Sequence, residues 1–160
     1  MASVAAASGY SRMAVYRHFG SRAGLLTALL AHIDEAERAD LAVREVLSAP
    51  TPREIVERLF AWWAGYVPRF AGVARGVLAA KHGDPDLRAA WDDRLRDLRR
   101  VCDAVADRAS EERDARRDLS DELWALLSVP LWIQLSDAGW DAERYRRTMT
   151  RLALGALPRR

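Results

Sequence analysis

The side chains best suited to a chemical role lie in a short polar row near the start of the chain. Arg12, Arg17 and Arg22 are cationic, and residues 1–33 contain no Asp or Glu. This segment has a net charge of +3, whereas the remaining 127 residues sum to −1. Arginine side chains bind phosphate groups and can form paired hydrogen bonds with guanine. The row therefore indicates binding to a polyanion, with double-stranded DNA as the expected partner.

The residues around this row predict two short helices joined by a tight turn. We expect a first helix at residues 4–7, ended by Gly9 because glycine adopts the positive φ of a helix C-terminus. A second helix is expected over residues 11–18, with Ser11 as its N-cap and Gly20 just beyond its end. Two helices so joined form a helix-turn-helix, whose second helix enters the DNA major groove.

The period of an α-helix assigns the two faces of this second helix. Val15 and Phe19 are four residues apart and both apolar, so we expect them to face the interior. Met13 and Arg17 lie on the opposite face. That face is expected to be exposed and to carry the residues that contact DNA.

The rest of the chain predicts an all-α fold, because breakers and capping residues separate segments of helical period. Thr51 and Glu54 form a capping box, and Asp84 is an N-cap before a proline. Pro68 is expected to break or bend the chain, and residues 110–118 to form a polar loop or a frayed helix end. Helices are expected at about residues 21–47, 52–67, 70–81, 85–109, 119–138 and 141–157.

Aromatic residues of the central helices are candidates for a ligand pocket. The chain has six tryptophans, and residues of this type more often belong to a hydrophobic core, so both interpretations remain open. The charged face of the helix at residues 85–109, which includes Arg94, is expected to be solvated. The residues best placed to line a pocket are Trp62, Tyr66, Phe70 and Trp91.

Other kinds of chemistry are disfavoured by the motifs that the sequence lacks. We find no P-loop, dinucleotide fingerprint, Gly-x-Ser-x-Gly or His-Glu-x-x-His motif, so we expect no enzyme activity and no cofactor. Cys102, the only cysteine, is expected to be an inert buried thiol, and His18, His32 and His82 lack the spacing of metal ligands. Without a signal-peptide pattern or a membrane-spanning apolar run, we expect a cytoplasmic protein with no membrane partner.

One segment resembles the DNA-binding motif of TetR-family transcriptional regulators. The resemblance is dense over about two dozen positions and includes the Tyr-x-His-Phe core. The residues that carry it are Val4-Ala5, Gly9-Tyr10-Ser11, Val15-Tyr16-Arg17-His18-Phe19, Ser21-Arg22 and Leu25-Leu26.

The resemblance implies a role for each part of the chain. It implies a partial helix-turn-helix domain at residues 1–40 and a helical ligand-binding and dimerisation domain at residues 41–160. It also implies a homodimer in which the last two helices pack as a four-helix bundle, with a small-molecule pocket in each subunit. The residues implied to meet operator DNA are Tyr10, Ser11, Arg12, Met13, Ala14, Tyr16, Arg17, His18 and Arg22. Those assigned to the dimer interface are Leu123, Leu127, Leu131, Tyr145, Met149 and Leu152.

Two departures from the family pattern leave alternatives open. The sequence has no room for the helix that precedes the helix-turn-helix in the family, and Tyr10 stands where a small aliphatic residue is usual. The leading hypothesis is a homodimeric repressor released from a palindromic operator by a small molecule. The alternative is a truncated helical ligand-binding or dimerisation protein that no longer binds DNA. A small all-helical enzyme is a third, for which the sequence offers no paired catalytic groups.

Overall fold

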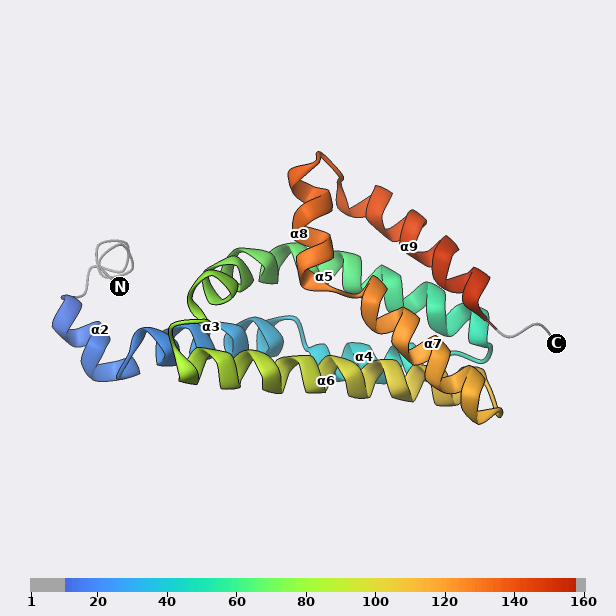
Figure 1. Cartoon of the computed structure of the whole chain (residues 1–160), viewed down its shortest axis with the longest axis horizontal. Helices are drawn as coiled ribbons and strands as arrows, with labels where there is room; N and C mark the ends of the chain where they lie inside the picture. The colour runs from blue at the N-terminus through green and yellow to red at the C-terminus, as the bar shows by residue number, and fades with distance from the viewer. Residues whose placement is uncertain (1–10, 158–160) are drawn as a thin grey trace.

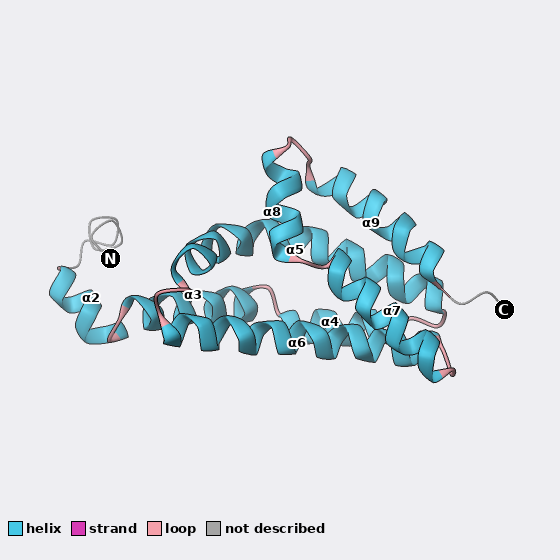
Figure 2. Ribbon diagram, viewed as in Figure 1, coloured by secondary structure: helices cyan, strands magenta, loops and turns pink. Residues whose placement is uncertain are grey.

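The computed structural model describes residues 11–157, except for the side chains of Arg12, Val15, Tyr16 and Arg22. The predicted all-α fold is confirmed there, since eight helices and no strand occur in this part of the chain (Figure 2). The predicted helix at residues 4–7 lies outside the described residues. The helices are α2 (Arg12–Phe19), α3 (Arg22–Ala36), α4 (Ala39–Leu47), α5 (Pro52–Ala80), α6 (Pro85–Ala109), α7 (Arg113–Leu126), α8 (Val129–Asp137) and α9 (Ala142–Ala156).

The predicted capping residues begin their helices as expected. The Ser21 hydroxyl accepts a hydrogen bond of 3.0 Å from the Gly24 N–H at the start of α3. The Asp84 carboxylate accepts from two backbone N–H groups of α6, at 3.1 and 3.2 Å. At the start of α5, the Thr51 side chain accepts from the Glu54 N–H at 3.2 Å and donates to the Glu54 carboxylate at 3.0 Å. These bonds satisfy backbone donors that a helix start leaves free.

Helix α5 is the centre of the molecule. It lies between α3, α4 and α6 on one side and α8 and α9 on the other (Figure 1). Apolar side chains cover most of its circumference, and Ile55, Leu59, Phe60 and Phe70 are almost completely buried. The wide apolar face seen in the sequence is therefore explained by packing on both sides.

Pro68 bends α5, one of the two predicted outcomes, but does not end it, so the separate helices predicted at residues 52–67 and 70–81 are corrected to one. The helix continues from Pro52 to Ala80 with Pro68 inside it, and its second half bends away from the first (Figure 1). Proline removes one helical hydrogen bond and kinks a helix. Here Pro68 itself is exposed, while Val67 and Phe70 beside it are buried, and their packing holds the helix together.

Two predicted long helices are each divided in two, which is a second correction. The segment predicted as one helix at residues 21–47 breaks at Arg38, which adopts the left-handed conformation with a φ of 49°. The predicted helix at residues 119–138 starts earlier, at Arg113, and ends at Leu126. Ser128 then caps α8, accepting from the Leu131 N–H at 3.4 Å, because Pro130 favours the first turn of a new helix. The final predicted helix, at residues 141–157, is confirmed.

Candidate functional site

Helix α2 is a short, cationic helix at one end of the molecule (Figure 1). Ser11 begins it as predicted, and its hydroxyl accepts from the Ala14 N–H at 3.1 Å. Its last turn carries Arg17 and His18, and its first turn carries no acidic residue. It packs chiefly on α3, so α3 fixes its position.

The described side chains of α2 divide into the two faces that the sequence predicts. Met13 is 78% exposed, and Arg17 and His18 are also exposed. Phe19 is half-buried, and Leu25 of α3 is buried. The outer face therefore offers a long apolar side chain, a guanidinium and an imidazole to a partner.

Of the other residues implied to meet DNA, Ser11 is exposed and Ala14 half-buried. Tyr10 lies outside the described residues, as do the side chains of Arg12, Tyr16 and Arg22. Their roles at DNA stay predictions.

Two glycines shape the turn between α2 and α3. Gly20 has a φ of +70°, which ends α2 as predicted and is readily adopted by glycine. Gly24, in the first turn of α3, lies so close to the Phe19 carbonyl that a Cβ atom would clash with this oxygen. At both positions, the absence of a side chain allows the turn that packs α3 against α2.

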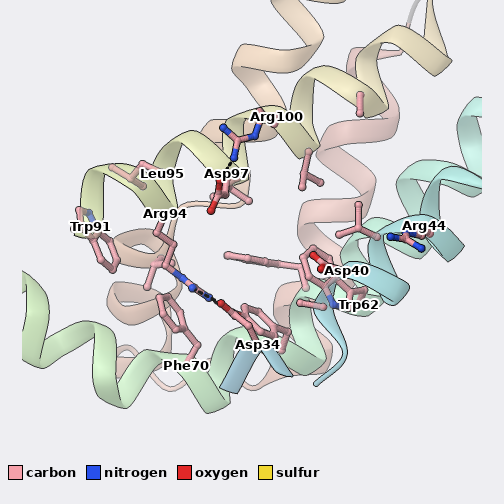
Figure 3. Close-up of a pocket in the computed structure, with 18 residues that line it drawn as sticks. Asp34, Asp40, Arg44, Trp62, Phe70, Trp91, Arg94, Leu95, Asp97 and Arg100 are labelled. Carbon is pink, nitrogen blue, oxygen red and sulfur yellow. Dashed lines mark hydrogen bonds and ion pairs between the residues drawn. The ribbon is translucent and has the colours of Figure 1, made fainter. Parts of the chain in front are cut away.

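A cavity of about 650 Å³ lies where α3, α4, α5 and α6 meet (Figure 3). The structure brings all four predicted pocket residues, Trp62, Tyr66, Phe70 and Trp91, to its wall. Trp62, Tyr66 and Phe70 follow one another at steps of four along α5, and neighbouring rings stack with centroids 5.4 and 5.9 Å apart. Trp91 of α6 extends the row at 6.1 Å from Phe70. Helical spacing thus builds one continuous aromatic wall.

An ion pair crosses the cavity wall and joins three helices. Arg94 of α6 donates two hydrogen bonds of 2.7 Å to the carboxylate of Asp34 on α3. The Tyr66 hydroxyl of α5 donates to Asp34 and accepts from Arg94. The guanidinium of Arg94 also lies 4.1 Å from the centre of the Phe70 ring, a favourable cation–π position. We call Asp34, Tyr66 and Arg94 the junction triad.

The electrostatics of the junction triad favour the charged form of both ions. Burial alone would raise the pKa of Asp34, but the hydrogen bonds from Arg94 and Tyr66 and the charge of Arg94 hold it below its usual value. Burial lowers the pKa of Arg94, and this is outweighed by its hydrogen bonds and charge interaction with Asp34. For Tyr66, burial raises the pKa of the phenol. The triad is therefore an ionised pair with a neutral tyrosine.

Two members of this triad, Asp34 and Arg94, were not predicted from the sequence. Arg94 was expected on the solvated face of its helix, whereas its side chain is 22% exposed and lines the cavity. A signal was present, since Arg94 lies three residues after Trp91 and four before Leu98, both on the inward stripe. Asp34 likewise follows the buried Leu30 by four residues.

The comparison with protein families gives one match. Residues 1–29 match the family model described as bacterial regulatory proteins, tetR family. The match supports a helix-turn-helix head of the TetR type in this part of the chain. This family consists of DNA-binding transcriptional regulators rather than enzymes, and the match covers α2 and half of α3. No curated protein and no solved structure matches the chain.

The TetR-family match does not reach the predicted dimer interface, and the structure corrects part of that set. Leu123, Leu127, Tyr145 and Met149 are turned into the protomer's own core and are almost completely buried. The Tyr145 hydroxyl donates to the Leu126 carbonyl at 2.5 Å, which fixes the ring inside. These four side chains cannot touch a second subunit in this conformation.

The two remaining members of the predicted interface are accessible. Leu152 is 49% exposed on α9, and Leu131 of α8 is partly buried. Trp124 of α7, which the sequence analysis did not assign to the interface, is 40% exposed. The outer surface of the last helices therefore does present large apolar side chains.

Other groups that the sequence singled out carry little chemistry. Cys102 is fully buried, and burial raises the pKa of its thiol to about 12, as an inert thiol requires. His32 and His82 are exposed. Within residues 11–157, we find no cluster of potential metal ligands, and none of the helices is long and apolar enough to cross a membrane.

Proposed function

We propose that this chain is a homodimeric TetR-family repressor that a small molecule releases from a palindromic operator in the cytoplasm. The observation that carries the proposal is the position of the cavity. It lies between α3, which supports the cationic helix α2, and the helices of residues 41–160, where a ligand-binding and dimerisation domain was predicted. A molecule in this cavity touches the element that positions the DNA-binding helix.

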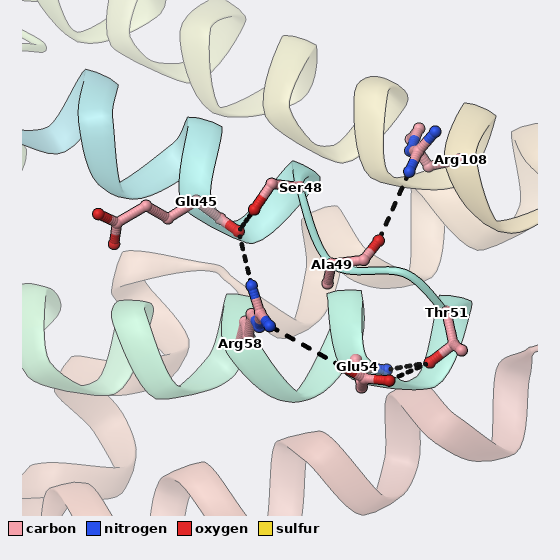
Figure 4. A network of polar contacts seen from close by, with 7 residues as sticks. All are labelled: Glu45, Ser48, Ala49, Thr51, Glu54, Arg58 and Arg108. Carbon is pink, nitrogen blue, oxygen red and sulfur yellow. Dashed lines mark hydrogen bonds and ion pairs between the residues drawn. The ribbon is translucent and has the colours of Figure 1, made fainter.

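Helix α4 supports such a coupling because its two ends are held differently. At its C-terminal end, the Glu45 carbonyl accepts from Arg58 at 3.2 Å and from Ser48 at 2.8 Å, and Arg108 donates to the Ala49 carbonyl at 3.5 Å (Figure 4). The N-terminal half of α4 lines the cavity instead. A ligand would therefore displace the cavity end of α4, next to the Arg38 junction with α3, while the other end stays anchored.

The dimer is proposed to form through α8 and α9. The exposed Leu152 and the accessible Leu131 supply apolar area on these helices, and Trp124 adds area on α7. Two subunits related by a two-fold axis would place their α2 helices in successive major grooves, about 34–36 Å apart.

The experiment that tests the function is a DNA-binding titration with the full chain. Fluorescence anisotropy would compare a palindrome from the DNA upstream of its gene with a scrambled duplex of the same composition. We expect a preference of about 1000-fold or more and a steep loss of affinity with salt, because phosphate contacts release counterions. Equal affinity for both duplexes would contradict the proposal and favour a helical protein that binds ligands but not DNA.

A matched pair of arginine substitutions separates groove contacts from general charge. Arg17→Ala removes an exposed cation of α2, and Arg53→Ala removes one from α5, where the side chain is 68% exposed. We expect Arg17→Ala to weaken operator binding about tenfold or more, since a base or phosphate contact is worth about 1–3 kcal/mol. Arg53→Ala should leave operator binding unchanged.

Sedimentation velocity tests the dimer. Leu152→Glu places a charge on the proposed interface and should shift the chain towards monomer, whereas Leu41→Glu, on the equally accessible α4, should not. If both variants sediment as the wild type does, the interface lies elsewhere.

A further inference from the structure

The junction triad ties α3 to both α5 and α6, whereas the Arg69–Glu37 pair, at the residue that ends α3, ties it to α5 alone. Asp34 belongs to α3, the helix on which α2 rests, whereas Arg94 and Tyr66 belong to α6 and α5. The two 2.7 Å bonds between Arg94 and Asp34 thus tie the DNA-binding end to the rest of the protomer. They do so at the cavity wall, where a bound molecule can reach both side chains (Figure 3).

The two ions are held with unequal strength. The Arg94 side chain is 22% exposed and rests on the Phe70 ring, while the Asp34 side chain is 37% exposed. Removing Arg94 from its place would cost its aromatic contact as well as its partner. Removing Asp34 costs less, because its carboxylate can be hydrated where it lies. Asp34 is therefore the exchangeable partner.

We infer that Arg94 is the anion-binding residue of the cavity, and that a flat, apolar molecule with one carboxylate binds there by replacing Asp34. The ligand's carboxylate would form the same paired hydrogen bonds with the guanidinium that Asp34 forms. Its apolar body would lie along the wall of Trp62 and Phe70, where flat rings stack favourably. Asp34 is then freed, and α3 loses its bonds with Arg94 and Tyr66, while the Arg69–Glu37 pair still joins its end to α5.

A cationic ligand fits these observations less well. It could pair with Asp34 only by displacing Arg94, whose guanidinium would be left partly buried without its carboxylate. Two other acids line the cavity: Asp97, on the same helix as Arg94, is paired with Arg100, and a cation held by Asp40 of α4 would leave the Asp34–Arg94 bonds intact. A neutral ligand would leave the Asp34–Arg94 bonds intact and so would not free α3. Of the three classes, only a carboxylate would both bind Arg94 and release Asp34 from it.

This inference rests on the proposed function, because it assigns a ligand class to the same cavity. Isothermal titration would compare three probes with one naphthalene body: naphthoate, its neutral amide naphthamide, and the cation naphthylmethylammonium. With the wild-type chain we expect naphthoate to bind at least about tenfold more tightly than either analogue. Tighter binding of the cation, or binding of none of the three, would overturn the inference.

Substitutions in the junction triad change the preference for the acid over the amide, which a merely structural role of these residues would not change. Asp34→Asn removes the internal competitor, so naphthoate should bind about threefold or more tightly than to the wild type, while naphthamide affinity stays constant. Arg94→Lys keeps the charge but not the paired geometry and should erase most of the preference for the acid. Asp137→Asn, which breaks the comparable pair with Arg75 outside the cavity, is the matched control and should change neither affinity. If Asp34→Asn weakens binding of acid and amide alike, the inference is wrong.

Hydrogen exchange separates failure of this inference from failure of the proposed function. Naphthoate should speed exchange of the amides in residues 22–36 of the wild type, and Asp34→Asn should do so without any probe. Operator binding is measured independently by anisotropy. A chain that prefers its operator but shows neither effect would retain the proposed function and lose this ligand class. A chain that shows both effects without operator preference would do the opposite.

Discussion

The DNA-binding end, α2 and α3, and the body, α4–α9, are held together in different ways. In the body, α5 is enclosed by its neighbours within a continuous apolar core, which extends to Ala153 and also includes Ala23 and Leu30 of α3. In the DNA-binding end, α2 rests chiefly on α3 and carries an exposed methionine and two exposed basic residues (Figure 1). Burial stabilises the body and α3, whereas α2 depends on the turn that joins it to α3, and the junction triad adds a polar tie between α3 and the body.

This difference explains how one small contact can act over a distance. Because α2 has little contact with the body, its position follows that of α3. Helix α3 in turn packs on α5 and α6 and is tied to them by Asp34. Few buried contacts also mean a low free energy of local opening. A ligand that breaks the Asp34–Arg94 bonds can therefore shift α3, and α2 with it.

The largest effect is expected from Phe60→Ala in the body. The Phe60 ring is fully buried on α5, so its removal should lower the free energy of unfolding by about 3–5 kcal/mol. Urea denaturation followed by far-UV circular dichroism measures this. Leu41→Ala, at a side chain 40% exposed on α4, is the control and should cost well under half as much. Equal losses would mean that the body's stability is not concentrated around α5.

The next effect is expected from Gly24→Ala at the turn of the DNA-binding end. A Cβ atom there would meet the Phe19 carbonyl, so the turn must open, at a cost of about 1–3 kcal/mol. We expect operator affinity to fall about tenfold or more while the urea midpoint of the body stays unchanged.

The control for this substitution is another helical glycine. Gly65→Ala adds its Cβ where no atom lies within 4 Å, and it should leave operator binding intact. It should also stabilise α5 by about 0.5–1 kcal/mol, because alanine favours helix more than glycine does. If Gly24→Ala behaves in the same way, the close approach at the turn is not required for DNA binding.

A smaller effect is expected from Asp34→Asn, which weakens the pairing of α3 with Arg94 of α6. The side chain is more than a third exposed, so solvent screens the pair and the loss should be about 1 kcal/mol or less. Its pH dependence is more diagnostic. The folded state holds the pKa of Asp34 below its usual value, so the pair contributes fully above the ordinary carboxyl pKa and is lost as pH falls through the folded one. The variant should therefore lose less stability on acidification than the wild type.

Hydrogen exchange in α3, measured between about pH 6 and pH 3, checks this dependence, since an ordinary aspartate titrates near 3.9. The wild type should lose protection of residues 22–36 in this range after correction for the intrinsic exchange rate. Asp34→Asn should start less protected and change less. A parallel decline in both proteins would show that other carboxylates control α3.

Short-range signals predicted much of this fold from the sequence, and the features they missed depend on tertiary packing. Ser21, Thr51 and Asp84 cap their helices as expected, because a cap depends on neighbours in the chain. Pro68 was expected to break or bend the chain, and it only bends α5, because buried residues on both sides offset its cost, which the sequence pattern does not show. The break between α3 and α4 lies at Arg38 and not at a glycine, so the residue type did not indicate it.

The candidate site shows the same division. The aromatic wall was predicted because Trp62, Tyr66 and Phe70 recur at helical spacing. Arg94 and Asp34 were missed because a charged residue on an amphipathic helix is normally solvated, and the pair is 60 residues apart in sequence. The interface residues Leu123, Leu127, Tyr145 and Met149 were misassigned because an apolar stripe does not say which surface covers it. Only the packing of α7 and α9 against their neighbouring helices shows which surface covers these side chains.

The smallest effect is expected from Asp137→Asn, and it sharpens the contrast between the two regions. Arg75 and Asp137 form paired hydrogen bonds of 3.0 and 2.5 Å, much as Arg94 and Asp34 do, but they join α5 to α8 inside the body and both side chains are exposed. Solvent screens an exposed pair, and α5 and α8 are already held by apolar contacts. We therefore expect no measurable change in the urea midpoint, in α3 protection or in operator affinity. A loss of α3 protection in Asp137→Asn equal to that in Asp34→Asn would mean that position at the junction is not what gives the Asp34–Arg94 pair its effect.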